Sequence, residues 1–254
     1  MATIISVSEF FLISLAFGVG FFTFLIDTEK TGSGLMRVFS SILGTGSFLA
    51  LLIHLFRENS NQAQLLAYGI TTLGFLLIYF FHKEQKNFLS WAAYLIHTVA
   101  GAAAIYFGSS TLQDFLYLLS SALFLGGVTF AMMKGHWYLV TPKLSEAPLA
   151  KSVLGIWGLM FVKILITGFG VYIAWDFFQQ YTTLGEGYLF NWIMLVMRLV
   201  WGYLVILIMS IFAWKLVKMR SIQSATGIFY AMVIFVFIGE LISGYLFFKY
   251  GLYI

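Results

Sequence analysis

The sequence predicts an all-α integral membrane protein, an eight-helix transmembrane bundle, and two observations lead to this class. Of the 254 residues, 61% are hydrophobic and only 9% are charged, and the mean hydropathy is +0.95. A soluble domain carries about 25% charged residues. The apolar residues also gather in runs of about 20, the length that a helix needs to cross the hydrocarbon core. Lipid offers no partner to an unpaired backbone group, so such runs are expected to be helical.

Eight runs of this kind follow one another along a single polytopic membrane domain, 1–254. The expected spans are 5–27, 34–56, 64–82, 88–108, 113–134, 152–175, 188–214 and 226–248. Most connections between them are short, which favours up-and-down packing of neighbouring helices. The first run has no basic residue before it and carries Glu9 instead, so it is expected to be a retained helix and not a cleaved signal peptide.

Basic residues are distributed unevenly between the two sets of connections. Ten of them lie in the first, third, fifth and seventh connections, whereas only Arg57 and Lys249 lie in the other set or near the termini. The positive-inside rule then predicts that both termini face away from the cytoplasm. In a bacterium, this orientation corresponds to a multi-pass protein of the cytoplasmic (inner) membrane with periplasmic termini.

Two segments suggest an internal repeat. The sequence GLMRVFSSILGTG, which begins at Gly34, and the sequence GLMFVKILITGFG, which begins at Gly158, agree at seven of thirteen positions. The match favours two parallel four-helix halves, 1–110 and 111–254, related by an axis along the membrane normal. Chance recurrence of Gly, Leu and Phe in membrane helices is the alternative explanation.

Two histidines, His54 and His97, lie inside the second and fourth spans, which are expected to be diagonal neighbours in a four-helix half. Ionisable residues inside spans suggest function by default. Such a pair can hold a haem b iron from opposite faces, and the small residues at 100–104 leave room for a flat macrocycle. Against this, their depths differ by roughly 8–11 Å at about 1.5 Å rise per residue. Hydrogen-bonded core histidines are the alternative.

The stretch AMMKGHWYLVTPKLSEAPL, residues 131–149, contains both prolines of the chain, Pro142 and Pro148. It also contains His136 and Tyr138, and Trp and Tyr are typical of headgroup depth. Proline ends helices and stiffens turns, so the stretch favours a rigid interfacial connector. The alternative is a pocket for a quinone or a lipid head, or a docking edge for another membrane subunit, with His136 and Tyr138 as binding groups.

Three ionisable residues, Lys163, Arg198 and Glu240, lie near the middle of the last three spans. An unpaired cation at that depth is costly, so Glu240 is expected within salt-bridge reach of Lys163 or Arg198. One interpretation is an ion-paired core. The other is a proton relay or a site for an anionic substrate, because two cations and one carboxylate leave a surplus positive charge.

The sequence excludes several classes of protein and leaves three open. It has no cysteine, which rules out disulfides and iron–sulfur clusters, and it has no phosphate loop, dinucleotide fingerprint or HExxH motif. Its net charge of +4 is explained by orientation and not by nucleic-acid binding. The favoured class is a membrane subunit of an electron-transfer or energy-coupling system that binds haem b or a quinone. The alternatives are a small-solute or ion transporter or channel that uses Lys163, Arg198 and Glu240, and a non-catalytic scaffold subunit of a larger complex in the bilayer.

Overall fold

The computed structural model describes residues 2–26, 31–57, 61–81, 88–141, 144–180 and 188–254. Within these ranges all regular structure is helical, and eight helices are long and apolar enough to cross a membrane. They are α1 (Ala2–Phe22), α3 (Ser33–Leu55), α4 (Gln62–Phe81), α5 (Phe88–Phe107), α6 (Leu112–Val140), α7 (Ala147–Ile173), the continuous run of α9 (Tyr188–Leu199), η2 (Val200–Val205) and α10 (Ile206–Lys218), and α11 (Ile222–Tyr250). Two short helices, η1 (Thr23–Leu25) and α8 (Trp175–Gln180), follow α1 and α7. The predicted all-helical, multi-pass class is confirmed.

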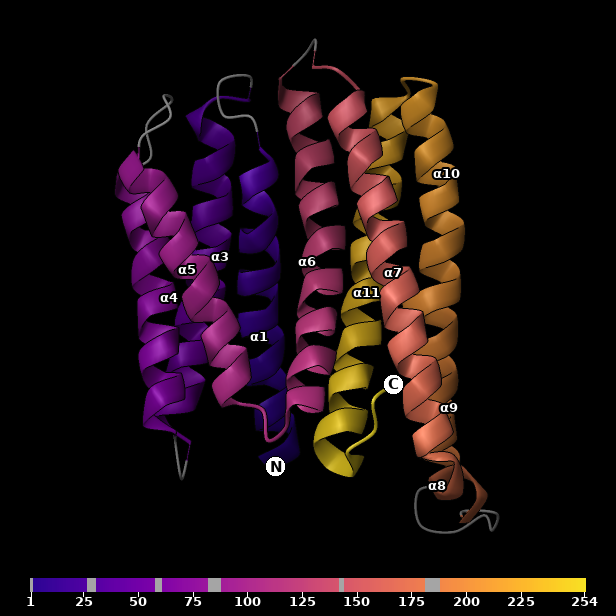
Figure 1. The fold of residues 1–254 in the computed structure, drawn as a ribbon. Coiled ribbons are helices and arrows are strands. Elements are labelled where there is room, and N and C mark those ends of the chain that lie inside the picture. The colour runs from indigo at the N-terminus through magenta and orange to yellow at the C-terminus, as the bar shows by residue number, and fades with distance from the viewer. Residues whose placement is uncertain (1, 27–30, 58–60, 82–87, 142–143, 181–187) are drawn as a thin grey trace.

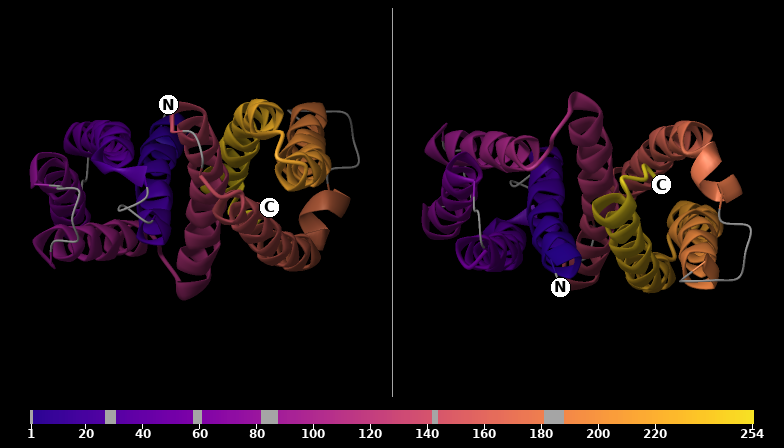
Figure 2. Two further views of the ribbon diagram at one scale, coloured as in Figure 1. Left: turned by 90° about the horizontal axis from the view of Figure 1, so that it is seen from above. Right: turned by 90° about the horizontal axis from the view of Figure 1, so that it is seen from below.

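The long helices form two four-membered groups that stand side by side (Figures 1 and 2). In the group of α1, α3, α4 and α5, which we call the first ring, each helix packs against the next and α5 packs against α1. The second ring is built in the same way from α6, α7, α10 with its preceding segments, and α11. The rings meet through α1, which packs against α6 and α11.

A rotation that relates the two rings stays a prediction. If the halves were repeats, Gly44 and Gly168 would be equivalent. A Cβ atom added at Gly44 would lie 3.5 Å from Phe75, whereas one added at Gly168 would meet no described atom within 4 Å. The surroundings of the two glycines differ, so they lend the repeat no support.

Helices α1 and α6 cross at glycines. A Cβ atom at Gly126 would overlap backbone atoms of Gly18, and one at Gly18 would overlap the carbonyl oxygen of Ala122. Small residues let the backbones of membrane helices approach this closely. The two rings are therefore joined by a contact of backbone against backbone.

Helices α6 and α7 are longer than the sequence predicts. Helix α6 continues to Val140 and α7 begins at Ala147, so most of residues 131–149 is helical and the connection is shorter than the predicted spans, 113–134 and 152–175, imply. Hydropathy marks only the part of a helix that lies in hydrocarbon, while the helix itself continues through headgroup depth. Pro148 lies in the first turn of α7, where its missing N–H removes no helical hydrogen bond. Pro142 lies outside the described residues.

Candidate functional site

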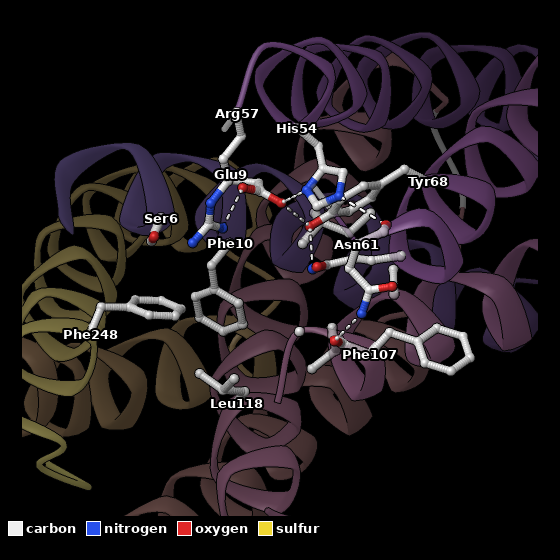
Figure 3. Close-up of a pocket in the computed structure, with 15 residues that line it drawn as sticks. Ser6, Glu9, Phe10, His54, Arg57, Asn61, Tyr68, Phe107, Leu118 and Phe248 are labelled. Carbon is white, nitrogen blue, oxygen red and sulfur yellow. Dashed lines mark hydrogen bonds and ion pairs between the residues drawn. The ribbon is translucent and has the colours of Figure 1, made fainter. Parts of the chain in front are cut away.

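A polar pocket of about 230 Å³ lies at the end of the first ring where α1 begins and α3 ends (Figure 3). Its polar side chains belong to α1, α3 and α4 or to residues beside these helices. They are Ser6, Glu9, His54, Arg57, Asn61, Gln64 and Tyr68. Helix α5 contributes apolar residues to the opposite wall, among them Ile105 and Phe107. We call this cavity the Glu9 pocket.

Glu9 is the hydrogen-bonding centre of the pocket. Its Oε1 lies 2.7 Å from Nδ1 of His54 and accepts a hydrogen bond of 2.9 Å from the hydroxyl of Tyr68. Its Oε2 accepts a hydrogen bond of 3.2 Å from Nη1 of Arg57. The side chain of Glu9 is only 3% exposed. Three partners thus compensate the desolvation of this carboxyl group.

The partners of His54 restrict where its protons lie. Its Nε2 is 3.2 Å from the carbonyl oxygen of Asn61, which can only accept, so Nε2 carries a proton and donates it. The proton between Nδ1 and Oε1 of Glu9 then belongs either to an imidazolium beside a carboxylate or to a carboxylic acid beside a neutral imidazole. The pair therefore shares one proton between these two atoms.

His97 lies away from this pocket, in the interior of the first ring. Its Nδ1 is 2.9 Å from the carbonyl oxygen of Thr71. Its imidazole packs on the phenyl group of Phe75, with the two aromatic centroids 3.4 Å apart. Its Nε2 is buried and has no hydrogen-bond partner among the described residues. A Cβ atom at Gly20 would lie 2.9 Å from Nε2, so α1 occupies the space beside this nitrogen.

The two predicted haem ligands therefore have different surroundings. Both ring nitrogens of His54 face protein acceptors, and the unpartnered nitrogen of His97 faces the backbone of α1. Among the described residues, no cluster of three or more His, Asp or Glu side chains could hold a metal ion. The haem site stays a prediction, and these contacts do not favour it.

His136 and Tyr138 contact different neighbours, and their predicted role as binding groups stays a prediction. Nδ1 of His136 lies 2.7 Å from the hydroxyl of Tyr230 on α11. The hydroxyl of Tyr138 donates instead to the carbonyl oxygen of Ser145, just before α7, at 2.7 Å. Tyr138 lines a cavity beside α7, and His136 is not among the residues that line it. The two side chains thus serve different helix contacts.

Arg198 and Glu240 form a buried ion pair in the second ring. Nη1 of Arg198 lies 2.9 Å from Oε1 of Glu240, and Nη2 donates to the hydroxyl of Tyr203 at 2.7 Å. The expected pairing of Glu240 with one of the two cations is confirmed. The two side chains are close enough for an ion pair, but they are not aligned for a hydrogen bond. Neither Glu240 oxygen has a hydrogen-bond partner among the described residues.

Lys163 is fully buried in the same ring. Its Nζ donates to Oγ of Ser121 and lies 3.8 Å from the ring centre of Tyr117. An ammonium above an aromatic face is stabilised by the ring quadrupole, and more so away from water. Whether the cluster serves as a relay or a substrate site stays a prediction.

The continuous helix of α9, η2 and α10 is locally wider beside Arg198. The segment η2 is π-helical, and the guanidinium carbon of Arg198 lies 4.3 Å from the ring centre of Tyr203, five residues further on. In an α-helix, positions five apart point in different directions, whereas a π turn aligns them. Such turns are frequent at functional sites.

The end of the second ring next to the Glu9 pocket is covered. Gly251, with a left-handed φ of 71°, ends α11 and turns the chain back. Leu252 and Ile254 are then buried, and the carbonyl oxygen of Ile254 accepts hydrogen bonds from Tyr117 and Ser243. Residues 252–254 thus cover this end of the second ring.

Comparison with protein-family models, curated proteins and solved structures found no match for the chain. The function must therefore be argued from the geometry. Sequence reasoning missed three residues that build the Glu9 pocket, namely Glu9, Arg57 and Tyr68. Glu9 carried a usable signal, since it is a carboxyl group inside an apolar span. Arg57 and Tyr68 join it only through the packing of α1, α3 and α4.

Proposed function

We propose that the chain is an integral membrane subunit of an energy-coupling system in which Glu9 and His54 exchange a proton with the aqueous phase. The observation that carries the proposal is the 2.7 Å contact between Oε1 of Glu9 and Nδ1 of His54 in a polar pocket. Relays of Asp, Glu and His side chains are the usual proton pathways of membrane pumps and transporters. By the distribution of basic residues, the pocket faces the periplasm of a bacterial inner membrane.

Arg57 lowers the electrostatic cost of both protonation states of the Glu9–His54 pair. Its side chain is 41% exposed while that of Glu9 is 3% exposed, so the guanidinium lies between the buried carboxyl group and solvent. With the shared proton present, the Glu9, His54 and Arg57 groups together carry one positive charge. After its release, the guanidinium neutralises the Glu9 carboxylate. Neither state leaves an unpaired negative charge in a low-dielectric site.

Transport of a small anion through the second ring is a second candidate function. It is favoured by the surplus positive charge of Lys163 and Arg198 over Glu240, and by Nε of Arg198, a buried donor that has no hydrogen-bond partner among the described residues. Uptake of small carboxylates into proteoliposomes that is lost in Arg198→Gln would support it.

An infrared pH titration of the purified protein in lipid nanodiscs tests the first proposal. We expect a carboxylic-acid or imidazole band that titrates in the wild type and is lost in both Glu9→Gln and His54→Gln. Glu146→Gln, at an exposed carboxyl group outside the pocket, is the matched control and should keep the band. A difference spectrum that Glu9→Gln leaves unchanged would refute the proposal.

A further inference from the structure

Two adjoining cavities flank Lys134 at the opposite end of the protein, where α6 ends and α7 begins (Figure 1). One has a volume of about 310 Å³ and the other of about 270 Å³. Leu25, Lys134 and Pro148 line both of them. The two cavities therefore adjoin at these three residues, and together we call them the Lys134 cavity.

The ammonium group of Lys134 is buried but not fully engaged. The residue is 7% exposed, and its Nζ donates to the carbonyl oxygen of Pro148 at 2.9 Å and to Oγ of Ser152 at 3.4 Å. An ammonium has three N–H donors, and the described hydrogen-bond acceptors take two. The third donor and the charge itself are available to a ligand.

A second cation, Lys151, lines the same cavity. No carboxyl group is among the described residues that line either part. Glu146 precedes α7, but it is paired with Arg220 at 3.2 Å. A hydrogen bond from its own backbone and the guanidinium of Arg220 lower the pKa of Glu146, so it stays ionised within that exposed pair. The two lysines thus lack a described counter-charge.

Most of the remaining lining residues are apolar, apart from Thr31, Tyr138 and Ser145 in the smaller part, and they indicate the depth of the site in the membrane. Phe22, Phe130 and Leu159 line the larger part, and Trp137 lines the smaller part. Tryptophan is typical of the headgroup level, where one edge of the ring is wet and the other lies in hydrocarbon. A ligand that matches this space has an anionic head and an apolar tail.

We propose that the Lys134 cavity binds an anionic phospholipid, with its phosphate at Lys134 and Lys151 and an acyl chain beside Phe22 and Leu159. Basic pockets between transmembrane helices on the cytoplasmic side bind such headgroups. A quinone fits less well, because its neutral carbonyl groups offset neither cation, whereas a phosphate forms charge-assisted hydrogen bonds with both.

The test measures thermal unfolding of the delipidated full chain in detergent, with and without added phosphatidylglycerol. We expect the lipid to raise Tm of the wild type by about 4 °C or more at saturation. Lys151→Gln, at an exposed position, and Lys134→Gln should abolish this shift. Gly155→Leu should abolish it with both lysines kept, because a Cβ at Gly155 meets no described atom within 4 Å and the leucine would fill the cavity.

Two matched controls keep the test specific. Lys215→Gln removes an exposed cation from the same end of the membrane by the positive-inside distribution, and Gly158→Leu adds the same bulk one turn from Gly155, outside the cavity. Both should retain the full shift. Equal loss in Lys215→Gln would reduce the effect to general surface charge and overturn the proposal. So would an equal shift with inorganic phosphate alone, or one with a neutral quinone that survives Lys151→Gln.

Discussion

Nδ1 of His54 lies 2.7 Å from Oε1 of Glu9, although 45 residues separate them in sequence. The contact ties the first turns of α1 to the last turn of α3. It also turns a costly buried carboxyl group into the centre of a network with Tyr68 and Arg57. The same three partners that compensate the burial of Glu9 in a membrane span therefore form the centre of the proposed proton-exchange site.

Replacing Glu9 should destabilise the first ring. Glu9→Ala leaves Nδ1 of His54 and the hydroxyl of Tyr68 without their acceptor, which costs about 1–3 kcal/mol for each buried group left unpaired. Glu9→Gln should cost less, because its amide oxygen still accepts. Thermal or denaturant unfolding in detergent measures both. Equal losses for the two variants would show that hydrogen bonding to Oε1 contributes little.

The Arg198–Glu240 pair should behave non-additively. Glu240→Gln alone strands a guanidinium that is 0% exposed, and breaking a buried pair in this way costs about 3–5 kcal/mol. The double variant Arg198→Met/Glu240→Gln should be more stable than the single variant, because it leaves no guanidinium without its carboxylate partner. A double-mutant cycle measured by unfolding gives the coupling. Simple additivity would mean that the two groups do not interact.

The predicted haem site can be checked by absorption spectroscopy of the purified protein. Because both nitrogens of His54 face protein acceptors and α1 lies against Nε2 of His97, we expect no Soret band. A Soret band that is present in the wild type and absent in His97→Ala would contradict this expectation. It would then favour electron transfer over proton exchange as the activity of the first ring.

The crossing of α1 and α6 should be sensitive to a single methyl group. Gly126→Ala places a Cβ against the backbone of Gly18 and is expected to cost about 1–3 kcal/mol through overpacking. Gly227→Ala, on α11, meets no described atom within 4 Å and should be neutral or stabilising by up to about 1 kcal/mol, since alanine favours a helix. Comparable unfolding midpoints for the two variants would show that the crossing relaxes at little cost.

The distribution of basic residues predicts the sidedness. Tags placed at both termini should react only with reagents applied to the periplasmic side, and the 141–146 connection should react only from the cytoplasm. Accessibility labelling of single-cysteine variants is direct, since the chain has no cysteine of its own. Labelling of either terminus from the cytoplasm would reverse the proposed orientation of the Glu9 pocket.

The spans were predictable because hydropathy measures what a bilayer requires of a helix. The same measure placed the end of α6 and the start of α7 wrongly, since His136 and Trp137 continue α6 beyond the predicted end at residue 134, and α7 begins at Ala147 and not at residue 152. The π-helical segment η2 left no recognisable pattern, because it depends on the packing of Arg198 and Tyr203.

The candidate site was predictable only where charge pairing decides the partner. Glu240 was expected beside Lys163 or Arg198, because an unpaired cation at that depth is unfavourable, and it lies beside Arg198. The partners of His54 were not predictable, since Glu9 and Tyr68 reach it from two other helices. His54 and His97 are both histidines of the first ring of helices, but sequence alone could not show which hydrogen-bond acceptors each would meet.

The meeting of Gly18 and Gly126 limits the motions open to the protein. Many transporters work by rocking one helical half against the other around a central site. Here the two halves touch backbone to backbone at one crossing, where no side chain can change rotamer to let α1 and α6 slide, while side chains such as Phe11 and Phe237 pack between the halves elsewhere. Any conformational cycle is therefore expected to run inside a ring, through rotation of side chains such as Arg57 or adjustment of η2. The protein would then work by changing which buried groups meet water while its two halves stay fixed.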